Sequence, residues 1–173
     1  MAEVETRQLQ LDMVVPDFTL PAIDGGQVSP RDYRQKANLV IAYLKLTQCE
    51  QCVGFLQELA DNYHIYRDLD TEVLAVCPES VPELQARIGH LGLPFPVLSD
   101  LGGQVGDVYL SRQPCESPVA ELFVTDRYGA LRTTMVACSG SELPNQQSIL
   151  DWLSLIESEC PECSDEEPGQ WPR

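Results

Sequence analysis

Basic side chains are scarce in this sequence. Lys and Arg together number 11, against 27 Asp and Glu, so the formal net charge is −16 over 173 residues. A chain this acidic repels phosphate backbones and anionic lipid. Neither nucleic acid nor a membrane is therefore an expected partner.

Long apolar runs are missing as well, and none approaches the roughly 20 residues that a bilayer-spanning helix needs. The opening residues, MAEVETRQLQLDMVV, also lack the basic region and the apolar stretch of a secretory signal. We therefore expect a cytoplasmic protein. The content of apolar residues, 43%, predicts a single domain with a sizeable core.

Cysteine, by contrast, is plentiful. The count of seven is odd, and without an export signal the thiols are expected to stay reduced rather than to form a structural disulfide framework. Pairs at C-x-x-C spacing then indicate redox or metal sites. The pairs with this spacing are Cys49/Cys52 and Cys160/Cys163, and the isolated cysteines are Cys77, Cys115 and Cys138.

Hydrophobic patterning predicts strands that alternate with helices. The continuous apolar run 39–44 is typical of a strand buried on both faces, and the C-x-x-C of Cys49 follows it within a few residues. Further strands are expected at 71–76, 95–98, 121–125 and 131–137, and helices at about 55–66, 80–91, 101–110 and from 149 to near Glu159. This order predicts an α/β sheet.

The chain divides into three parts on this basis. Residues 1–13 are an N-terminal extension, 14–159 form the single domain, and 160–173 form an acidic, cysteine-containing tail.

Five short motifs make a family recognisable. They are Val15–Leu20 (VPDFTL), Asp24–Ser29 (DGGQVS), Glu72–Val76 (EVLAV), Phe95–Asp100 (FPVLSD) and Phe123–Asp126 (FVTD) followed by Gly129. In this order, from about Val15 to about Leu155, they resemble the redoxin and AhpC/TSA superfamily. The resemblance implies a thioredoxin-like fold, with a central mixed sheet flanked by helices and an N-terminal redoxin-type extension. It also implies an oxidoreductase whose only cofactor is its redox-active cysteines, with no metal.

Peroxiredoxins of this superfamily carry P-x-x-x-(T/S)-x-x-C, and a distant Arg activates the thiol. Here Ala42 and Leu46 occupy the proline and hydroxyl positions, and that Arg is absent. Thr47, two residues before Cys49, is the remaining hydroxyl that could bind a substrate or peroxide. The resemblance thus leaves open an atypical peroxiredoxin in which Cys49 is peroxidatic and Cys52 resolving.

The thiol-disulfide oxidoreductases of the TlpA and ResA type resemble the chain more closely at the motif itself. Residues 39–52 align with their strand and C-x-x-C without a gap, although Gln48 replaces the usual Trp. The resemblance makes Cys49 the nucleophile and Cys52 the resolving cysteine. Pro118 is the best candidate for the substrate-binding cis-proline of that group.

The C-x-x-C spacing itself suits redox chemistry. A cysteine at the amino end of a helix faces unpaired N–H groups and the helix dipole, which favour the thiolate. Cys49 can then attack a disulfide, and Cys52 can displace the product. Glu50 and the acidic domain disfavour that thiolate, which predicts a reductant rather than an oxidant.

The function favoured is thus a thiol-disulfide oxidoreductase in redox homeostasis. Its substrates would be protein disulfides or peroxides, and an unidentified thiol would regenerate it. The oligomeric state stays open, with a homodimer as the assembly that many relatives form. A third alternative is a non-catalytic redoxin that binds a partner or zinc through its cysteines.

The other cysteines admit several interpretations. Cys160 and Cys163 form an auxiliary dithiol that relays electrons, a solvated pair or, less favoured, half of a four-thiolate zinc site. Cys77 is expected in the core. Cys115 lies in a loop before Pro118 and could be a further redox partner, whereas Cys138 is expected to be structural.

Overall fold

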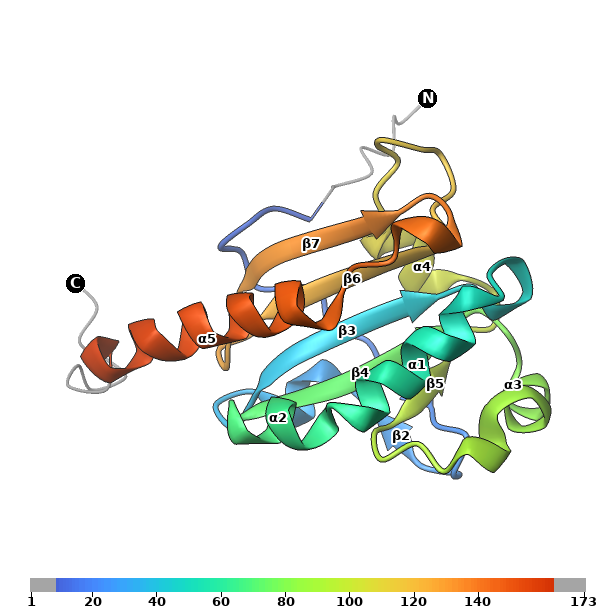
Figure 1. Ribbon diagram of the computed structural model, residues 1–173, viewed down its shortest axis with the longest axis horizontal. Coiled ribbons are helices and arrows are strands. Elements are labelled where there is room, and N and C mark those ends of the chain that lie inside the picture. Colours follow the sequence, from blue (N-terminus) through green and yellow to red (C-terminus); the bar gives the residue numbers. More distant parts are fainter. Residues whose placement is uncertain (1–8, 164–173) are drawn as a thin grey trace.

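The computed structural model describes residues 9–163, of which 160–163 are described by their backbone only (Figure 1). The strands are β1 (Leu20–Pro21), β2 (Gln27–Val28), β3 (Asn38–Leu44), β4 (Thr71–Cys77), β5 (Val97–Ser99), β6 (Ala120–Thr125) and β7 (Leu131–Ala137). The α-helices are α1 (Gln51–Asp61), α2 (Tyr63–Asp68), α3 (Val81–Ile88), α4 (Gln104–Tyr109) and α5 (Gln146–Cys163). Short 3-10 turns are η1 (Pro30–Tyr33), η2 (Leu46–Gln48), η3 (Gly89–Leu91) and η4 (Gly140–Glu142).

A five-stranded mixed sheet in the order β5-β4-β3-β6-β7 forms the centre of the molecule. Strand β3 pairs in parallel with β4 and antiparallel with β6. Every residue of β3 is buried, which explains its continuous apolar run, since alternate side chains enter the cores on the two faces. The predicted thioredoxin-like fold with a mixed sheet is confirmed.

The larger core lies on the face covered by α1, α2 and α5, which cross in front of the sheet in Figure 1. Phe55 and Leu59 of α1 pack there against alternate residues of β3, and Leu153 of α5 is fully buried beside them. Burial of one such side chain contributes about 1.5–3 kcal/mol. This packing fixes the start of α1 against the end of β3.

The smaller core, on the opposite face, is covered by α4 and by the N-terminal segment. Asp100 organises it, because its carboxylate accepts hydrogen bonds from the N–H groups of Val105 and Gly106 and from the Tyr43 hydroxyl (2.8 Å). Burial, followed by the hydrogen bond to Asp100, raises the pKa of Tyr43. A methyl group on Gly106 would lie 3.0 Å from Cζ of Tyr43, so only glycine allows this approach.

The N-terminal segment adds to the sheet edge. The N–H of Asp12 donates to Leu131 (2.7 Å), the N–H of Leu131 donates to Met13 (2.9 Å), and Val14 forms a bridge with Ala130. Residues 12–14, at the predicted boundary between the N-terminal extension and the domain, therefore hydrogen-bond to the β6–β7 hairpin.

Three elements differ from expectation. The helical pattern 55–66 is divided at Asn62, which separates α1 from α2. Helix α5 continues to Cys163 instead of ending near Glu159. Segment 95–98 contributes only its second half to β5. Among residues 9–163, no helix combines the length and the apolar character that crossing a membrane requires.

Candidate active site

The Cys49/Cys52 pair lies where β3 leads into α1. The η2 turn follows β3, and Cys49 comes directly after this turn. Helix α1 begins two residues after Cys49. The two cysteines form a disulfide with their Cα atoms 5.4 Å apart, and the N–H of Cys52 donates to the Cys49 carbonyl (3.2 Å). The C-x-x-C spacing therefore closes within one helical turn.

This disulfide is deeply recessed. Cys49 is 3% exposed and Cys52 is 0% exposed, and both belong to the larger core. The flanking residues Thr47, Gln48 and Glu50 are exposed and form the rim. The residues on both sides of Cys49 are therefore exposed, whereas the two cysteines are shielded from solvent.

A buried carboxylate supports the turn before Cys49. Oε1 of Glu79 accepts a hydrogen bond from the N–H of Thr47 (2.8 Å), while Oε2 has no hydrogen-bond partner in the part of the chain that the structure describes. Ser99 donates to the Glu79 carbonyl (2.6 Å). Patterning could not single out Glu79, because its burial depends on the contact between the β4 end and η2.

Cys77 is unpaired among the cysteines whose side chains are described, and it is fully buried. Burial, with a smaller contribution from the charge of Glu79, raises the pKa of the Cys77 thiol well above its usual value. The expectation of a core cysteine is confirmed, and burial keeps its thiol out of contact with solvent.

A cavity of about 690 Å³ opens at the same edge of the sheet. Lys45, directly after β3, and Pro118, directly before β6, lie on its wall. The ammonium group of Lys45 donates to Ser117 (2.8 Å), and burial lowers the pKa of Lys45. Pro118 thus lines a cavity next to the active-site turn.

Pro118, the best candidate for the substrate-binding cis-proline, does not follow a cis peptide bond. Within residues 9–163 the cis bond precedes Pro114. Val119 is already held in the sheet, since its N–H donates to Ala137 and its carbonyl accepts from Lys45 (both 2.9 Å). Pro118 therefore leads directly into an extended strand.

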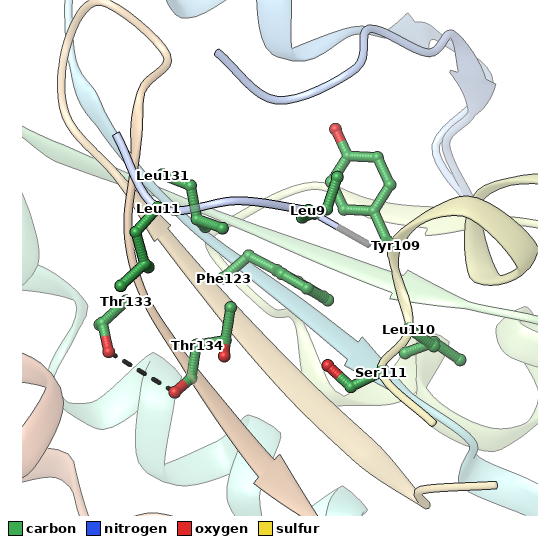
Figure 2. Close-up of a pocket in the computed structure, with 9 residues that line it drawn as sticks. All are labelled: Leu9, Leu11, Tyr109, Leu110, Ser111, Phe123, Leu131, Thr133 and Thr134. Carbon is green, nitrogen blue, oxygen red and sulfur yellow. Dashed lines mark hydrogen bonds between the residues drawn. The ribbon is translucent and has the colours of Figure 1, made fainter. Parts of the chain in front are cut away.

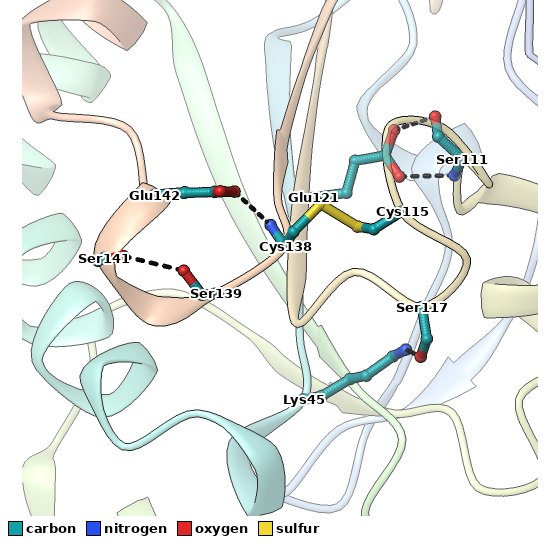
Figure 3. Close-up of a disulfide and its surroundings, with 9 residues drawn as sticks. All are labelled: Lys45, Ser111, Cys115, Ser117, Glu121, Cys138, Ser139, Ser141 and Glu142. Carbon is teal, nitrogen blue, oxygen red and sulfur yellow. Dashed lines mark hydrogen bonds between the residues drawn. A yellow bond between two sulfur atoms is a disulfide. The ribbon is translucent and has the colours of Figure 1, made fainter.

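Cys115 and Cys138 are not isolated, which corrects the expectation that they stay unpaired. They form a disulfide with their Cα atoms 6.1 Å apart (Figure 3). The antiparallel pairing of Ala120 with Ala137 brings the loop before β6 next to the end of β7. Sequence spacing could not reveal this pair, because its members lie 23 positions apart.

A second cavity, of about 260 Å³, lies over the β6–β7 hairpin on the other core (Figure 2). Leu9 and Leu11 of the N-terminal segment, Phe123 and Thr134 are among its lining residues, and none of those lining residues is a cysteine. It is therefore separate from the candidate active site.

The side chains of Cys160 and Cys163 lie outside the described residues, as does the acidic segment after Cys163. The relay and the zinc site that involve this pair stay predictions. Within the described residues, no group of three or more His, Cys, Asp or Glu side chains is arranged to hold a metal ion.

A disulfide that joins a cysteine two residues before a helix to the first turn of that helix, after the central strand of a mixed sheet, defines a redoxin of the thioredoxin fold. The AhpC/TSA family model matches residues 12–134, and the chain belongs to this family. Family membership and relatives named as peroxiredoxins make it an oxidoreductase.

Individual proteins agree with this assignment. Alkyl hydroperoxide reductase E of Mycobacterium tuberculosis is 28% identical over 151 residues, which cover 86% of this chain and 98% of that protein. The reduced 2-Cys peroxiredoxin of Plasmodium vivax superposes with a TM-score of 0.73 at 16% identity, covering 93% and 88% of the two chains. A candidate protein disulfide isomerase of Bacteroides thetaiotaomicron superposes with 0.71 at 17% identity, covering 91% and 96%.

Proposed function

We propose that the protein is a thiol-disulfide oxidoreductase that acts through Cys49 and Cys52. The observation that carries the proposal is the Cys49–Cys52 disulfide at the start of α1. In the reduced protein, the Cys49 thiolate attacks a substrate disulfide and releases one substrate thiolate. Cys52 then attacks Cys49 of the mixed disulfide, which forms the Cys49–Cys52 bond and releases the second substrate thiolate. Two electrons have then passed from the protein to the substrate.

The surroundings of the pair support this division of roles. Cys49 precedes α1, where unpaired N–H groups favour a thiolate, whereas Cys52 is inside the helix and fully buried. Thr47 and Pro118 flank the site as candidate substrate contacts. An external thiol of unidentified nature would restore the dithiol.

Stopped-flow measurement of the reduced protein with a model aromatic disulfide tests the proposal. We expect fast exchange that is lost in Cys49→Ser and kept in Cys77→Ala, because Cys77 is buried away from solvent. Failure of the reduced wild-type protein to exchange with any disulfide would exclude this function.

Peroxide reduction is the second candidate, favoured by the alkyl hydroperoxide reductase and peroxiredoxin relatives. Cys49 would attack the peroxide to give a sulfenic acid and an alcohol, and Cys52 would condense with it, releasing water and forming the same disulfide. Against this, Ala42 and Leu46 leave no proline and no hydroxyl at the family positions. Rapid peroxide consumption, lost in Cys49→Ser, would establish this candidate instead.

The reductant role predicted from Glu50 and the net charge belongs to the same proposal. A reduction potential near the thioredoxin value of about −270 mV is expected, and one near about −120 mV, typical of the oxidant DsbA, would contradict it.

A further inference from the structure

We propose that Cys115–Cys138 is a second redox-active disulfide, through which a protein thiol reductant returns electrons to Cys49–Cys52. The inference rests on the proposed function, because it supplies the regeneration step of the same cycle. It gives a role to two cysteines that the reaction of Cys49 and Cys52 does not use.

The two disulfides differ in access. The Cys49–Cys52 disulfide is almost fully buried, whereas Cys115 and Cys138 are both partly exposed. Thiol-disulfide exchange requires the attacking sulfur to contact the disulfide sulfur. Because Cys115 and Cys138 are the more exposed pair, we expect a protein dithiol to react with Cys115–Cys138 first.

Both disulfides lie at one edge of the sheet. In the strand register, Leu44 at the end of β3 pairs with Ala120, and Ala120 pairs with Ala137. Neighbouring strands are about 4.8 Å apart, so Cys138, which follows Ala137, begins two strand spacings from the end of β3.

The chain on each side of Cys115–Cys138 also contacts the active-site segment. On the Cys138 side, η4 lies against α1, and a methyl group on Gly140 would be 3.1 Å from Cβ of Gln51, a residue between the two active cysteines. On the Cys115 side, Ser117 accepts the hydrogen bond of Lys45, as Figure 3 shows. The second disulfide therefore joins two segments that flank the first.

The hydrogen bond between the Lys45 N–H and the Val119 carbonyl places the segments that contain Cys49 and Cys115 near each other. Cys49 follows Lys45 by four residues, and Cys115 precedes Val119 by four. Because the two chains run antiparallel, both segments extend from this hydrogen bond toward the same side of the molecule. The residues between Cys115 and Pro118 are exposed, and an extended chain spans about 3.3 Å per residue. Once its disulfide opens, Cys115 is tethered within reach of Cys49.

The electrons balance at each step. The reductant's first thiolate attacks Cys115–Cys138, and its second thiol closes the reductant's own disulfide and releases the Cys115/Cys138 dithiol. The Cys115 thiolate then attacks the Cys49 sulfur and expels the Cys52 thiolate. Cys138 displaces Cys49 from the mixed disulfide, which reforms Cys115–Cys138 and leaves Cys49 and Cys52 as free thiols. The Cys49/Cys52 pair has then gained two electrons and two protons.

Kinetics of the wild-type protein test the order of events. The oxidised protein is mixed with reduced thioredoxin, quenched with an alkylating reagent at intervals, and mapped by mass spectrometry. At the earliest intervals we expect label on Cys115 and Cys138, before transfer to Cys49 and Cys52 reforms the Cys115–Cys138 disulfide, and we expect thioredoxin in a mixed disulfide with Cys115 or Cys138. A mixed disulfide of thioredoxin with Cys49, and none with Cys115 or Cys138, overturns the relay.

Removal of the relay gives the second measurement. In C115S/C138S, thioredoxin should reduce Cys49–Cys52 at least about tenfold more slowly, whereas dithiothreitol, a dithiol small enough to bypass the relay, should still reduce it. An unchanged rate with thioredoxin overturns the relay while the proposed function stands. Reduced protein that cannot exchange with a model disulfide overturns both.

Trapping shows whether the sulfurs meet. C52S/C138S leaves Cys49 and Cys115 without their partners, and mild oxidation should then link them, as peptide mapping would reveal. C52S/C115S is the matched variant for a Cys49–Cys138 link. Absence of both links overturns the proposal.

Discussion

The two disulfides differ in how the chain brings their sulfurs together. Cys49 and Cys52 are separated by three positions and meet on a single helical turn. Cys115 and Cys138 are separated by 23 positions and meet only because β6 and β7 pair antiparallel. Local geometry therefore guarantees the first disulfide, whereas the second depends on the tertiary structure.

The largest expected effect distinguishes the roles of Cys49 and Cys52. Cys52→Ser should lower multiple-turnover disulfide exchange by about 100-fold or more, because the mixed disulfide on Cys49 is no longer resolved. Intact-mass spectrometry should show substrate attached to Cys49. Cys77→Ala is the control and should retain turnover; equal turnover in Cys52→Ser would show that Cys52 does not resolve the intermediate.

The next effect compares what each disulfide contributes to stability. The chain-entropy relation gives about 3 kcal/mol for the larger loop of Cys115–Cys138 and about 2 kcal/mol for the Cys49–Cys52 loop. Urea unfolding of oxidised C115S/C138S and C49S/C52S should therefore show the greater loss of unfolding free energy in the first variant. The opposite ranking would indicate that the loop between Cys115 and Cys138 is already ordered without its disulfide.

Gly140 connects the two regions and should show a smaller effect. In Gly140→Ala the added methyl group would lie 2.6 Å from Cδ of Gln51, so that side chain must move at a cost of about 1 kcal/mol. Thermal unfolding should show this loss, and Gln51→Ala in the same chain should restore most of it. Without such restoration, the two residues are not coupled.

The smallest effect concerns the carboxylate at the base of the Cys115 loop. Glu121 is fully buried and accepts hydrogen bonds from the N–H and hydroxyl of Ser111 (2.7 and 2.6 Å). Burial raises the pKa of Glu121, and the Ser111 hydrogen bonds partly oppose this. The folded protein thus binds this proton more tightly than the unfolded chain, so the contribution of Glu121 to stability falls as pH rises through the folded pKa.

Glu121→Gln removes that dependence. We expect the variant to gain a few tenths of a kcal/mol relative to wild type at pH 7 and nothing near pH 4, measured by urea unfolding at both pH values. Ser111→Ala is the control for the hydrogen bonds. A difference independent of pH would show that ionisation of Glu121 is not responsible.

The features predictable from sequence are those that neighbouring residues determine. The run 39–44 identified β3, and the C-x-x-C spacing identified the Cys49–Cys52 pair. The hairpin turn Asp126–Gly129 was also predictable, because Gly129 adopts a positive φ of 84° that glycine favours.

The features that were missed depend on contacts between distant segments. The Cys115–Cys138 disulfide needs the β6–β7 register, and the burial of Glu79 needs the η2 turn to close over it. Pro118 was the candidate for a cis-proline, whereas the cis bond found within residues 9–163 precedes Pro114. Sequence spacing carries no information about these contacts.

The register of β7 has a consequence for insertions and deletions. Its one irregularity lies next to the turn, where Val124 pairs with Thr133 and Thr125 with Leu131, so that Arg132 is the extra residue. Length changes near the turn can be absorbed at this bulge. A residue gained or lost between Thr133 and Ala137 would instead turn Cys138 to the opposite face of the sheet and separate it from Cys115.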